Sequence, residues 1–155
     1  MTPLYARSLR GTRAFGSVPR NRGANVTLIS TLSSDGTTST LTLEEAMDRI
    51  AFDVYVERVL VPSLRIGQTV VMDNLSVHKS PRARELIEAQ SYFLRFLPTY
   101  QRIHGFLYSP NLNPIEGMFP KLKTYLRRVG ARSRAALDDA IGAGLAMVSA
   151  MDARG

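Results

Sequence analysis

Residues 70–79 read VVMDNLSVHK, and this stretch decides the fold. Three apolar residues run directly into Asp73, and polar residues follow. A short apolar run bounded by turn residues is typical of a buried strand, so we interpret 69–74 as a central strand buried on both faces. Asp73 then lies at the carboxyl end of that strand, the edge of an open α/β sheet where sites form. From this position alone, a turn cap and a ligand are equal alternatives.

A hairpin and a helix are predicted ahead of this strand. VTLISTL, SSDG and TTSTLTL (26–43) give an apolar β-branched run, a turn and a period-two alternation, which together predict a β-hairpin with Asp35 in its turn. We place the N-cap of the next helix at Asp48 because the strand alternation runs almost up to it. Thr42 with Glu45 offers an alternative start as a capping box.

Helices and a strand alternate in the second half of the chain. Ser80 before Pro81 marks a helix start, and 92–98 (YFLRFLP) reads as a strand ended by proline. NPIE (113–116) marks a further helix start, and a last helix runs from about 133 to 150. Strands separated by helices after a hairpin predict an α/β fold, with one mixed sheet and helices packed on its faces.

The helix that begins at NPIE combines a core-facing stripe with an internal proline. The stripe has helical spacing and consists of Ile115, Met118, Phe119, Leu122 and Leu126. Pro120 removes one backbone hydrogen bond and crowds the carbonyl of Glu116, at a cost of about 3 kcal/mol or a kink. The strain therefore falls on the backbone of an acidic residue.

The charge of the chain is basic and clustered. Its 155 residues include 20 Lys and Arg against 13 Asp and Glu, a formal net charge of +7, and no cysteine, which excludes disulfides and cysteine-ligated zinc. Residues 1–23 and 121–134 hold five and six basic residues and no acid. Such clusters attract nucleic acid, although a solvated surface explains either cluster equally well. Neither a secretory signal nor an apolar run of about 18 residues is present, so we expect a cytoplasmic protein.

Glu116 is the second acid of interest. At the third position of a helix a glutamate complements the positive helix end, and taken alone this explanation is the better one. Together with Asp73, however, it offers two carboxylates at element ends that a compact α/β fold can bring close. Oxygen ligands suit Mg²⁺ or Mn²⁺, and two such ions about 3.5–4 Å apart stabilise the attacking and leaving oxygens of phosphoryl transfer.

Several motifs resemble one known family. VVMDNLSVHK followed by FLP, SPNLNPIE and FPKLKTYLRR resembles the catalytic domain of mariner-superfamily DDE transposases from bacterial insertion sequences, over nearly the whole chain. The resemblance implies a ribonuclease-H-like fold, a carboxylate triad that binds two Mg²⁺, nicking of transposon ends in DNA, and strand transfer by the freed 3′-hydroxyl. By position, Asp73 matches the second Asp of the triad and Glu116 the final acid. These two are the expected catalytic and metal-binding residues.

The same motifs suggest residues that support the site. His78 and Lys79 occupy the family's HK position and are expected to contact DNA phosphate or to order the site. Asn74 is expected either to hydrogen-bond Asp73 or to end the strand.

Basic residues beside the last acid are expected to hold DNA. Lys123 and Arg127 lie on the same helical stripe as Glu116, so phosphate contact is geometrically sensible, although a solvated face is an equal alternative for each. The expected DNA-binding residues are His78, Lys79, Lys121, Lys123, Arg127 and Arg128.

Three departures from the family pattern point to a partial domain. The family's first Asp lies on a strand upstream of a stretch like MTPLYARSLRGTR, with which this sequence opens, so we expect the first strand and the first triad Asp to be missing. QRIHGFLY (101–108) reads as an insertion, and Pro120 strains the final acid. We therefore expect residues 1–155 to form one incomplete catalytic domain, with 1–25 an irregular basic segment.

The expected function is that of a truncated or inactive transposase, with two Mg²⁺ or Mn²⁺ ions held only in the intact family. Its expected partners are transposon-end and target DNA, with a homodimer as an open alternative and no membrane. In bacterial cytoplasm it would associate with the nucleoid when on DNA. A non-catalytic DNA-binding or assembly remnant is the main alternative. An unrelated basic α/β domain, in which DN and NPIE are only a turn and a cap, is the third.

Overall fold

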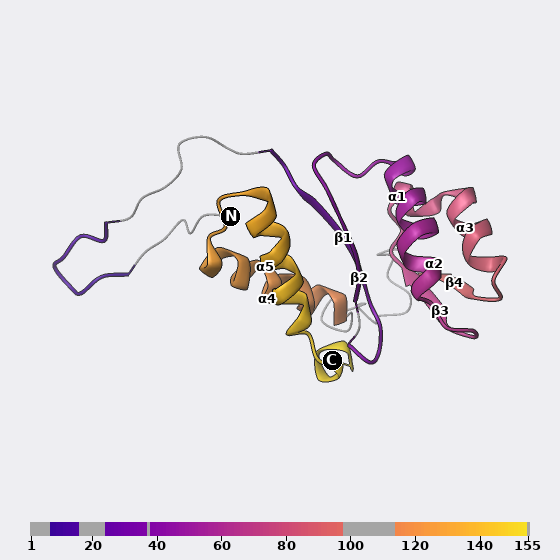
Figure 1. The fold of residues 1–155 in the computed structure, drawn as a ribbon. Helices are drawn as coiled ribbons and strands as arrows, with labels where there is room; N and C mark the ends of the chain where they lie inside the picture. The colour runs from indigo at the N-terminus through magenta and orange to yellow at the C-terminus, as the bar shows by residue number, and fades with distance from the viewer. Residues whose placement is uncertain (1–6, 16–23, 37, 98–113, 155) are drawn as a thin grey trace, which may run out of the picture.

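The computed structural model describes residues 7–15, 24–36, 38–97 and 114–154 (Figure 1). Its elements are β1 (Thr27–Leu32), β2 (Thr38–Leu43), α1 (Arg49–Tyr55), the π-helix η1 (Val56–Leu60), α2 (Val61–Ser63), β3 (Thr69–Met72), the 3₁₀-helix η2 (Ser76–Lys79), α3 (Pro81–Glu88), β4 (Phe93–Phe96), α4 (Pro114–Val129), α5 (Arg134–Ala146) and α6 (Ala150–Arg154). Strands β1 and β2 pair antiparallel, whereas β3 and β4 pair parallel. The predicted α/β class is confirmed, and the architecture is consistent with a ribonuclease-H-like fold.

The strands do not form the single mixed sheet that the sequence predicts. Within the described residues they form two separate two-stranded sheets, so β3 is an edge strand and not a central one. The prediction that β3 is buried on both faces is also wrong. Val70 and Met72 are buried against α1 and α3, but the side chain between them, Val71, is 58% exposed. The reason is that, within the described residues, α1 and α3 pack on the face that carries Val70 and Met72, whereas Val71 lies on the other face.

The β1–β2 hairpin stands between two groups of helices (Figure 1). Its two faces carry different apolar side chains because successive strand residues point to opposite sides. Ile29 and Leu41, which are cross-strand partners, pack into the cluster formed with α1, α3 and β3. Leu28 and Leu32 on the opposite face pack against α4 and α5. The period-two pattern thus makes the hairpin the middle layer of the molecule.

The first helical stretch begins where the sequence places it. The Asp48 side chain accepts a hydrogen bond from the Ala51 N–H, which confirms Asp48 as the N-cap over the Thr42 alternative. The helix then widens into the π-helix η1, in which the Val61 N–H donates to the Val56 carbonyl. Pro62 follows in α2 and cannot donate a backbone hydrogen bond, so the widened turn accommodates it and the helix ends one residue later.

The later helix starts agree with the sequence. Ser80 caps α3, since its Oγ accepts from the Ala83 N–H, and Pro81 takes the first helical position. Helix α4 begins at Pro114, and its apolar stripe is confirmed because Met118, Leu122 and Leu126 are buried while Ile115 and Phe119 pack around them. Helix α4 continues through Pro120. The predicted cap Asn113 and the insertion at 101–108 lie outside the described residues.

The prediction of one last helix from about 133 to 150 is wrong in where that helix ends. Helix α5 ends at Ala146, and a separate helix, α6, begins at Ala150. The break reflects a second helix start: the Ser149 Oγ accepts from the Asp152 N–H, and the Asp152 carboxylate accepts from the Ser149 N–H. This reciprocal pair is a capping box, which favours a new N-terminus over continuation of α5.

Candidate active site

Asp73 directly follows β3 and acts as a local cap. Its Oδ1 accepts a hydrogen bond from the Leu75 N–H at 3.0 Å and lies 2.6 Å from His78 Nδ1. The side chain is 51% exposed, and the described part of the chain gives its second oxygen no hydrogen bond. The two alternatives for Asp73 are therefore compatible, because the carboxylate closes a turn with one oxygen and leaves the other available to a ligand.

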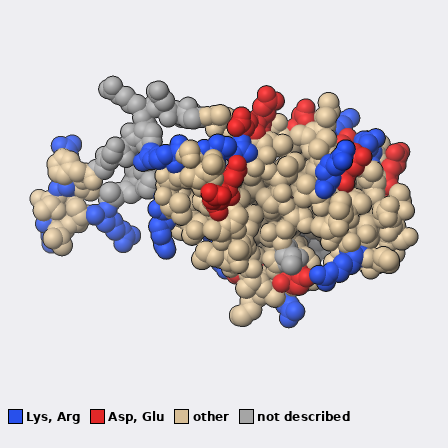
Figure 2. Space-filling view, in the orientation of Figure 1, with Lys and Arg blue, Asp and Glu red and all other residues tan. Residues whose placement is uncertain are grey.

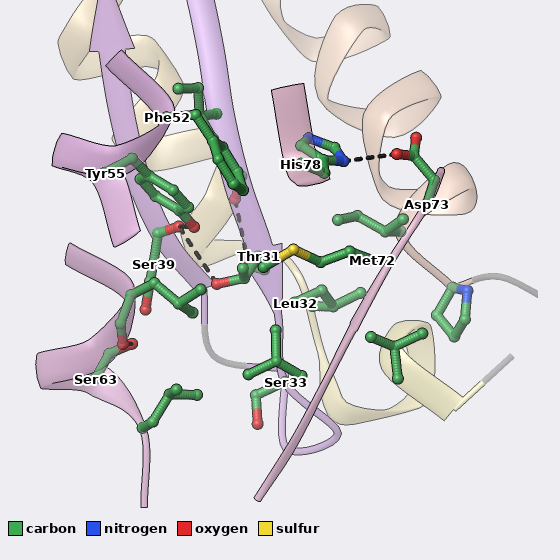
Figure 3. Close-up of a pocket in the computed structure, with 18 of the residues that line it drawn as sticks. Thr31, Leu32, Ser33, Ser39, Phe52, Tyr55, Ser63, Met72, Asp73 and His78 are labelled. Atoms are coloured by element: carbon green, nitrogen blue, oxygen red, sulfur yellow. Dashed lines mark hydrogen bonds and ion pairs between the residues drawn. The ribbon is translucent and has the colours of Figure 1, made fainter. Parts of the chain in front are cut away.

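His78 connects Asp73 to the protein core. It lies on η2, and its ring packs against the ring of Phe52 on α1, with centroids 4.7 Å apart and the planes inclined by 36°. The His78 side chain is only 18% exposed. Figure 3 shows the imidazole between Phe52 and the Asp73 carboxylate. This geometry supports the ordering role among the two expectations for His78. Lys79, the next residue, is exposed.

Asn74 closes the end of the parallel strand pair. Its Nδ2 donates to the Leu97 carbonyl, just beyond β4, and the Leu97 N–H donates to the Met72 carbonyl at 2.7 Å. The two hydrogen bonds join the carboxyl ends of β3 and β4. Of the two expectations for Asn74, the structure shows the strand-ending one, and this contact fixes the backbone on which Asp73 sits.

A cavity of about 790 Å³ brings the start of α4 to the same place as Asp73. Asp73 lines it from the end of β3 and His78 from η2, while Pro114, Ile115 and Phe119 line it from α4. Glu116 lies in the first turn of α4 and is exposed, but it is not among the residues that line this cavity. The structure thus places Asp73 and His78 on the same cavity as the turn that carries Glu116, without a contact between Glu116 and the cavity.

The donor set near Asp73 fits a hard divalent ion only in part. Across the described ranges, no group of three or more His, Asp and Glu side chains is arranged to hold a metal ion. Mg²⁺ in phosphoryl-transfer sites is commonly bound by one or two carboxylates, with water and substrate phosphate filling the other positions. The second oxygen of Asp73 is a ligand of that kind, whereas the exposed Glu116 carboxylate does not line the cavity beside Asp73.

The basic residues expected to bind DNA differ in their surroundings. Lys121 forms an ion pair within the chain, because its Nζ donates to the Asp152 carboxylate. This ion pair, with the hydrogen bonds from Ser149, lowers the pKa of Asp152 from 3.8 to about 2. Three other cations on α4 are exposed: Lys123, Arg127 and Arg128. Figure 2 shows Lys and Arg side chains at both ends of the visible face, including the end where residues 7–15 lie.

Phe52 is a site residue that sequence reasoning missed. It is 3% exposed and belongs to the core cluster under β3. Its position on α1 marks it only as a core aromatic, and its contact with His78 joins elements that are distant in the chain. The sequence carries no signal of that contact, which only the tertiary structure shows.

Comparison with known proteins identifies the family of this chain. Residues 1–138 match the family described as DDE superfamily endonuclease, a span that contains β3, Asp73, all of α4 and the first turn of α5. The chain belongs to this family of endonucleases. A search of curated proteins found no match. None of the helices described for the chain combines the length and apolar character that a membrane span requires.

Proposed function

We propose that the chain is the catalytic-domain part of a DNA transposase of the mariner superfamily, encoded by a bacterial insertion sequence. The observation that carries this proposal is the Asp73 carboxylate at the carboxyl end of β3, held in one orientation by His78 and the Leu75 N–H with one oxygen left available. A carboxylate fixed in this way beside a basic helix suits cleavage of a phosphodiester, and membership of an endonuclease family supports the same chemistry.

Each residue then has a defined part. Asp73 and Glu116 would hold the divalent ion, Mg²⁺ or Mn²⁺, which when bound polarises the phosphodiester and stabilises charge on the reacting oxygens. His78 orients Asp73 by its hydrogen bond. Lys123 and Arg127 on α4 would contact the phosphate backbone and so place the DNA over the ion.

We further propose that the purified chain alone does not nick DNA. The two matched acids, Asp73 and Glu116, suit one ion, whereas in-line phosphoryl transfer of this kind uses two. The test is incubation with supercoiled plasmid that carries transposon ends, in Mg²⁺ and then in Mn²⁺. Intact plasmid is the expected result. Nicking that Asp73→Asn abolishes would overturn the inactivity while supporting the transposase proposal.

Metal binding tests the site separately from activity. We expect Mn²⁺, followed by electron paramagnetic resonance, to bind the chain weakly at one site. Asp73→Asn and Glu116→Gln should each weaken that binding, whereas Glu45→Gln, a change of an exposed acid in the β2–α1 connection, should leave it unchanged. Equal Mn²⁺ affinity in all four proteins would exclude a shared site of Asp73 and Glu116.

A second candidate is a non-catalytic DNA-binding or assembly role, as a monomer or a homodimer. The exposed cations Lys123, Arg127 and Arg128 on one helix favour it. Its signature is a DNA affinity that falls with salt, needs no Mg²⁺ and is the same in Asp73→Asn. DNA binding that requires the divalent ion and is lost in Asp73→Asn would favour the catalytic proposal. In either role the protein would act on DNA in the bacterial cytoplasm.

A further inference from the structure

Asp73 and Glu116 belong to two different groups of helices. The buried residues of the described chain form two clusters, one built around α1, η1, β3 and α3 and the other around α4 and α5. The β1–β2 hairpin lies between them (Figure 1), with Ile29 in the first cluster and Leu28 packed against the second. Asp73 follows β3, and Glu116 lies on α4. Their relative position therefore depends on how each group is held on the hairpin.

Apolar contacts alone do not fix that position. Leu28 and Leu32 of β1 hold the hairpin against α4 and α5, but hydrophobic burial has no preferred direction and permits one surface to rotate on another. Direct packing beside Asp73 adds little constraint, because a cavity of about 790 Å³ has β3 on one wall and the first turn of α4 on another. A hydrogen bond is directional, so hydrogen bonds to the hairpin can set the angle between the two groups.

Arg134, the first residue of α5, makes such directional contacts with the hairpin. Its Nη2 donates to Thr42 Oγ1 at 2.9 Å and its Nη1 to the Glu44 carboxylate at 3.1 Å. Its Nε donates to Asp138 on its own helix at 2.7 Å, and the Thr42 hydroxyl donates to the other oxygen of Asp138 at 3.2 Å. We call these four side chains the Arg134 network. It joins the end of β2 to the start of α5, although Thr42 and Arg134 are 92 residues apart in the sequence.

The geometry of the network suits a positioning role. A guanidinium group is planar and its N–H groups point in fixed directions, so three partners fix both its distance and its angle. Arg84 makes a similar i,i+4 pair with Glu88, but both residues lie on α3. The Arg134 side chain is only 33% exposed and reaches a second element. Although Arg134 ends the basic segment 121–134, all three of its side-chain nitrogens donate within the chain, which separates it from the exposed cations on α4.

The hairpin also meets this group of helices at its turn. An added Cβ on Gly36 would lie 2.7 Å from the Ser149 carbonyl carbon, so the two backbones are in contact where α6 begins. Thr42 lies near the opposite, open end of the hairpin, and the Arg134 network is therefore a separate point of attachment. Two separated contacts define an orientation, whereas one contact leaves a pivot. Without the Arg134 network, the helix that carries Glu116 can turn about the Gly36 end.

We propose that Arg134 is a positioning residue for the metal site: its network holds α4 and α5 at one angle on the hairpin and so sets where Glu116 lies relative to Asp73. Arg134 acts through Thr42 and Glu44 and contacts neither DNA nor the metal ion. Its role toward the ion rests on the proposed function, whereas its role in placing the helices does not. Arg134→Lys keeps the charge but lacks the planar group that reaches all three partners, so lysine should not replace arginine here.

The placement of the helices is measured by the distance between two spin labels. The sequence contains no cysteine, so two introduced cysteines carry the only labels. Ile50→Cys is exposed on α1, the helix that packs on His78, and Gly117→Cys is exposed in the first turn of α4, where a Cβ meets nothing within 4 Å. Double electron–electron resonance of this labelled protein should give one narrow distance distribution. In Arg134→Gln and Arg134→Lys the distribution should broaden or shift.

Matched variants separate the network from a general loss of stability. Arg84→Gln breaks an i,i+4 pair that lies within one helix, and it should leave the label distance unchanged. Thr42→Val removes the hydroxyl that joins Arg134 to Asp138 but keeps the shape of the side chain, so the distance distribution should broaden. Thr42→Ser keeps the hydroxyl and should keep the narrow distribution. Circular dichroism checks that each variant is folded.

Mn²⁺ affinity of the unlabelled proteins, followed by electron paramagnetic resonance, tests the consequence for the metal site. We expect affinity to fall about tenfold in Arg134→Gln and in Thr42→Val, because the two acids are then no longer held in one arrangement before the ion binds. Thr42→Ser and Arg84→Gln should stay within about twofold of the wild type.

Three results would overturn the proposal. One is an unchanged label distance in both Arg134→Gln and Thr42→Val. Another is equal broadening in Arg84→Gln, since the loss of any ion pair would then loosen the protein. The third is a broadened distance with unchanged Mn²⁺ affinity, because the angle of the helices would then not affect the ion. If the wild type binds no Mn²⁺, the proposed metal site fails, and the label distances alone decide whether Arg134 places the helices.

Discussion

The Asp73 carboxylate is joined to the protein core through the ring of His78. His78 Nδ1 lies 2.6 Å from Asp73 Oδ1, and the same ring packs on buried Phe52. A half-exposed acid at a strand end would ordinarily sample several rotamers. Here its orientation is set by a side chain that is itself held by packing, which is the arrangement that a preorganised ligand site requires.

Removing the His78 ring should loosen Asp73. In His78→Ala we expect Mn²⁺ affinity to fall several-fold, because the carboxylate must then be ordered on binding. His78→Asn can place an amide N–H near the position of Nδ1 and should recover most of that affinity. Mn²⁺ titration followed by electron paramagnetic resonance measures both. If His78→Ala binds Mn²⁺ as tightly as the wild type, His78 has no positioning role.

Asp152 should make α6 sensitive to acid. Its pKa in the folded chain, about 2, lies below the ordinary value of 3.8 because of Lys121 and the Ser149 hydrogen bonds. The lowered pKa means that Asp152 contributes stability above about pH 4, which is lost as the pH falls toward 2. Asp152→Asn should remove this part of the pH dependence, measured by urea unfolding between pH 5 and 2. Asp139→Asn, at an exposed acid on α5, is the control and should keep it.

Tyr55 should limit stability in alkali. It is 1% exposed, and burial raises its pKa to about 12 while its hydroxyl donates to the Ser39 carbonyl at 2.8 Å. The neutral phenol is favoured in the fold, so its contribution is complete below about pH 10 and is lost between about 10 and 12. Tyr55→Phe should destabilise the protein by about 1 kcal/mol at pH 7. In Tyr55→Phe, the absorbance titration of the remaining tyrosines should lack the step with the highest pKa. An unchanged titration would contradict the assignment of that step to Tyr55.

Gly36 should resist substitution for two separable reasons. Its φ is 87°, and an added Cβ would lie 2.7 Å from the Ser149 carbonyl carbon, where the hairpin turn meets the start of α6. Gly67 has a φ of 84° but no neighbour within 4 Å of a Cβ. Gly67→Ala should therefore cost only the backbone term, about 1 kcal/mol. Gly36→Ala should cost clearly more in urea unfolding, and equal losses would mean that the turn does not contact α6.

Exposed cations on α4 should govern DNA affinity. Replacing both Lys123 and Arg127 by glutamine should weaken binding to any duplex and lower the slope of log affinity against log salt by about 1.8, or about 0.9 for each phosphate contact. Arg58→Gln, at an exposed cation on η1, is the control and should leave the slope unchanged. Fluorescence anisotropy at several salt concentrations measures the slope. An unchanged slope in the double variant would place the DNA elsewhere on the protein.

Sequence alone determined the local features of this protein. The caps at Asp48 and Ser80, the turn at Gly36 and the stripe of α4 follow from side-chain chemistry within a few residues of each position, and they are as predicted. The motifs around Asp73 and Glu116 pointed to the endonuclease family for the same reason, because a motif is local. The break before α6 was also written locally, in Ser149 and Asp152, but the apolar pattern of α5 concealed it.

Only the tertiary structure decided how these pieces meet. An apolar run such as VVM has the same sequence whether one face of the strand or both are covered. The exposure of Val71 and the cavity between β1 and β3 therefore had no sequence signal. The contact of Phe52 with His78 likewise joins residues on different helices. Pairing across a sheet and packing between helices depend on chain segments that are far apart in sequence. These interactions contribute to stability only when the segments are in contact in the folded chain.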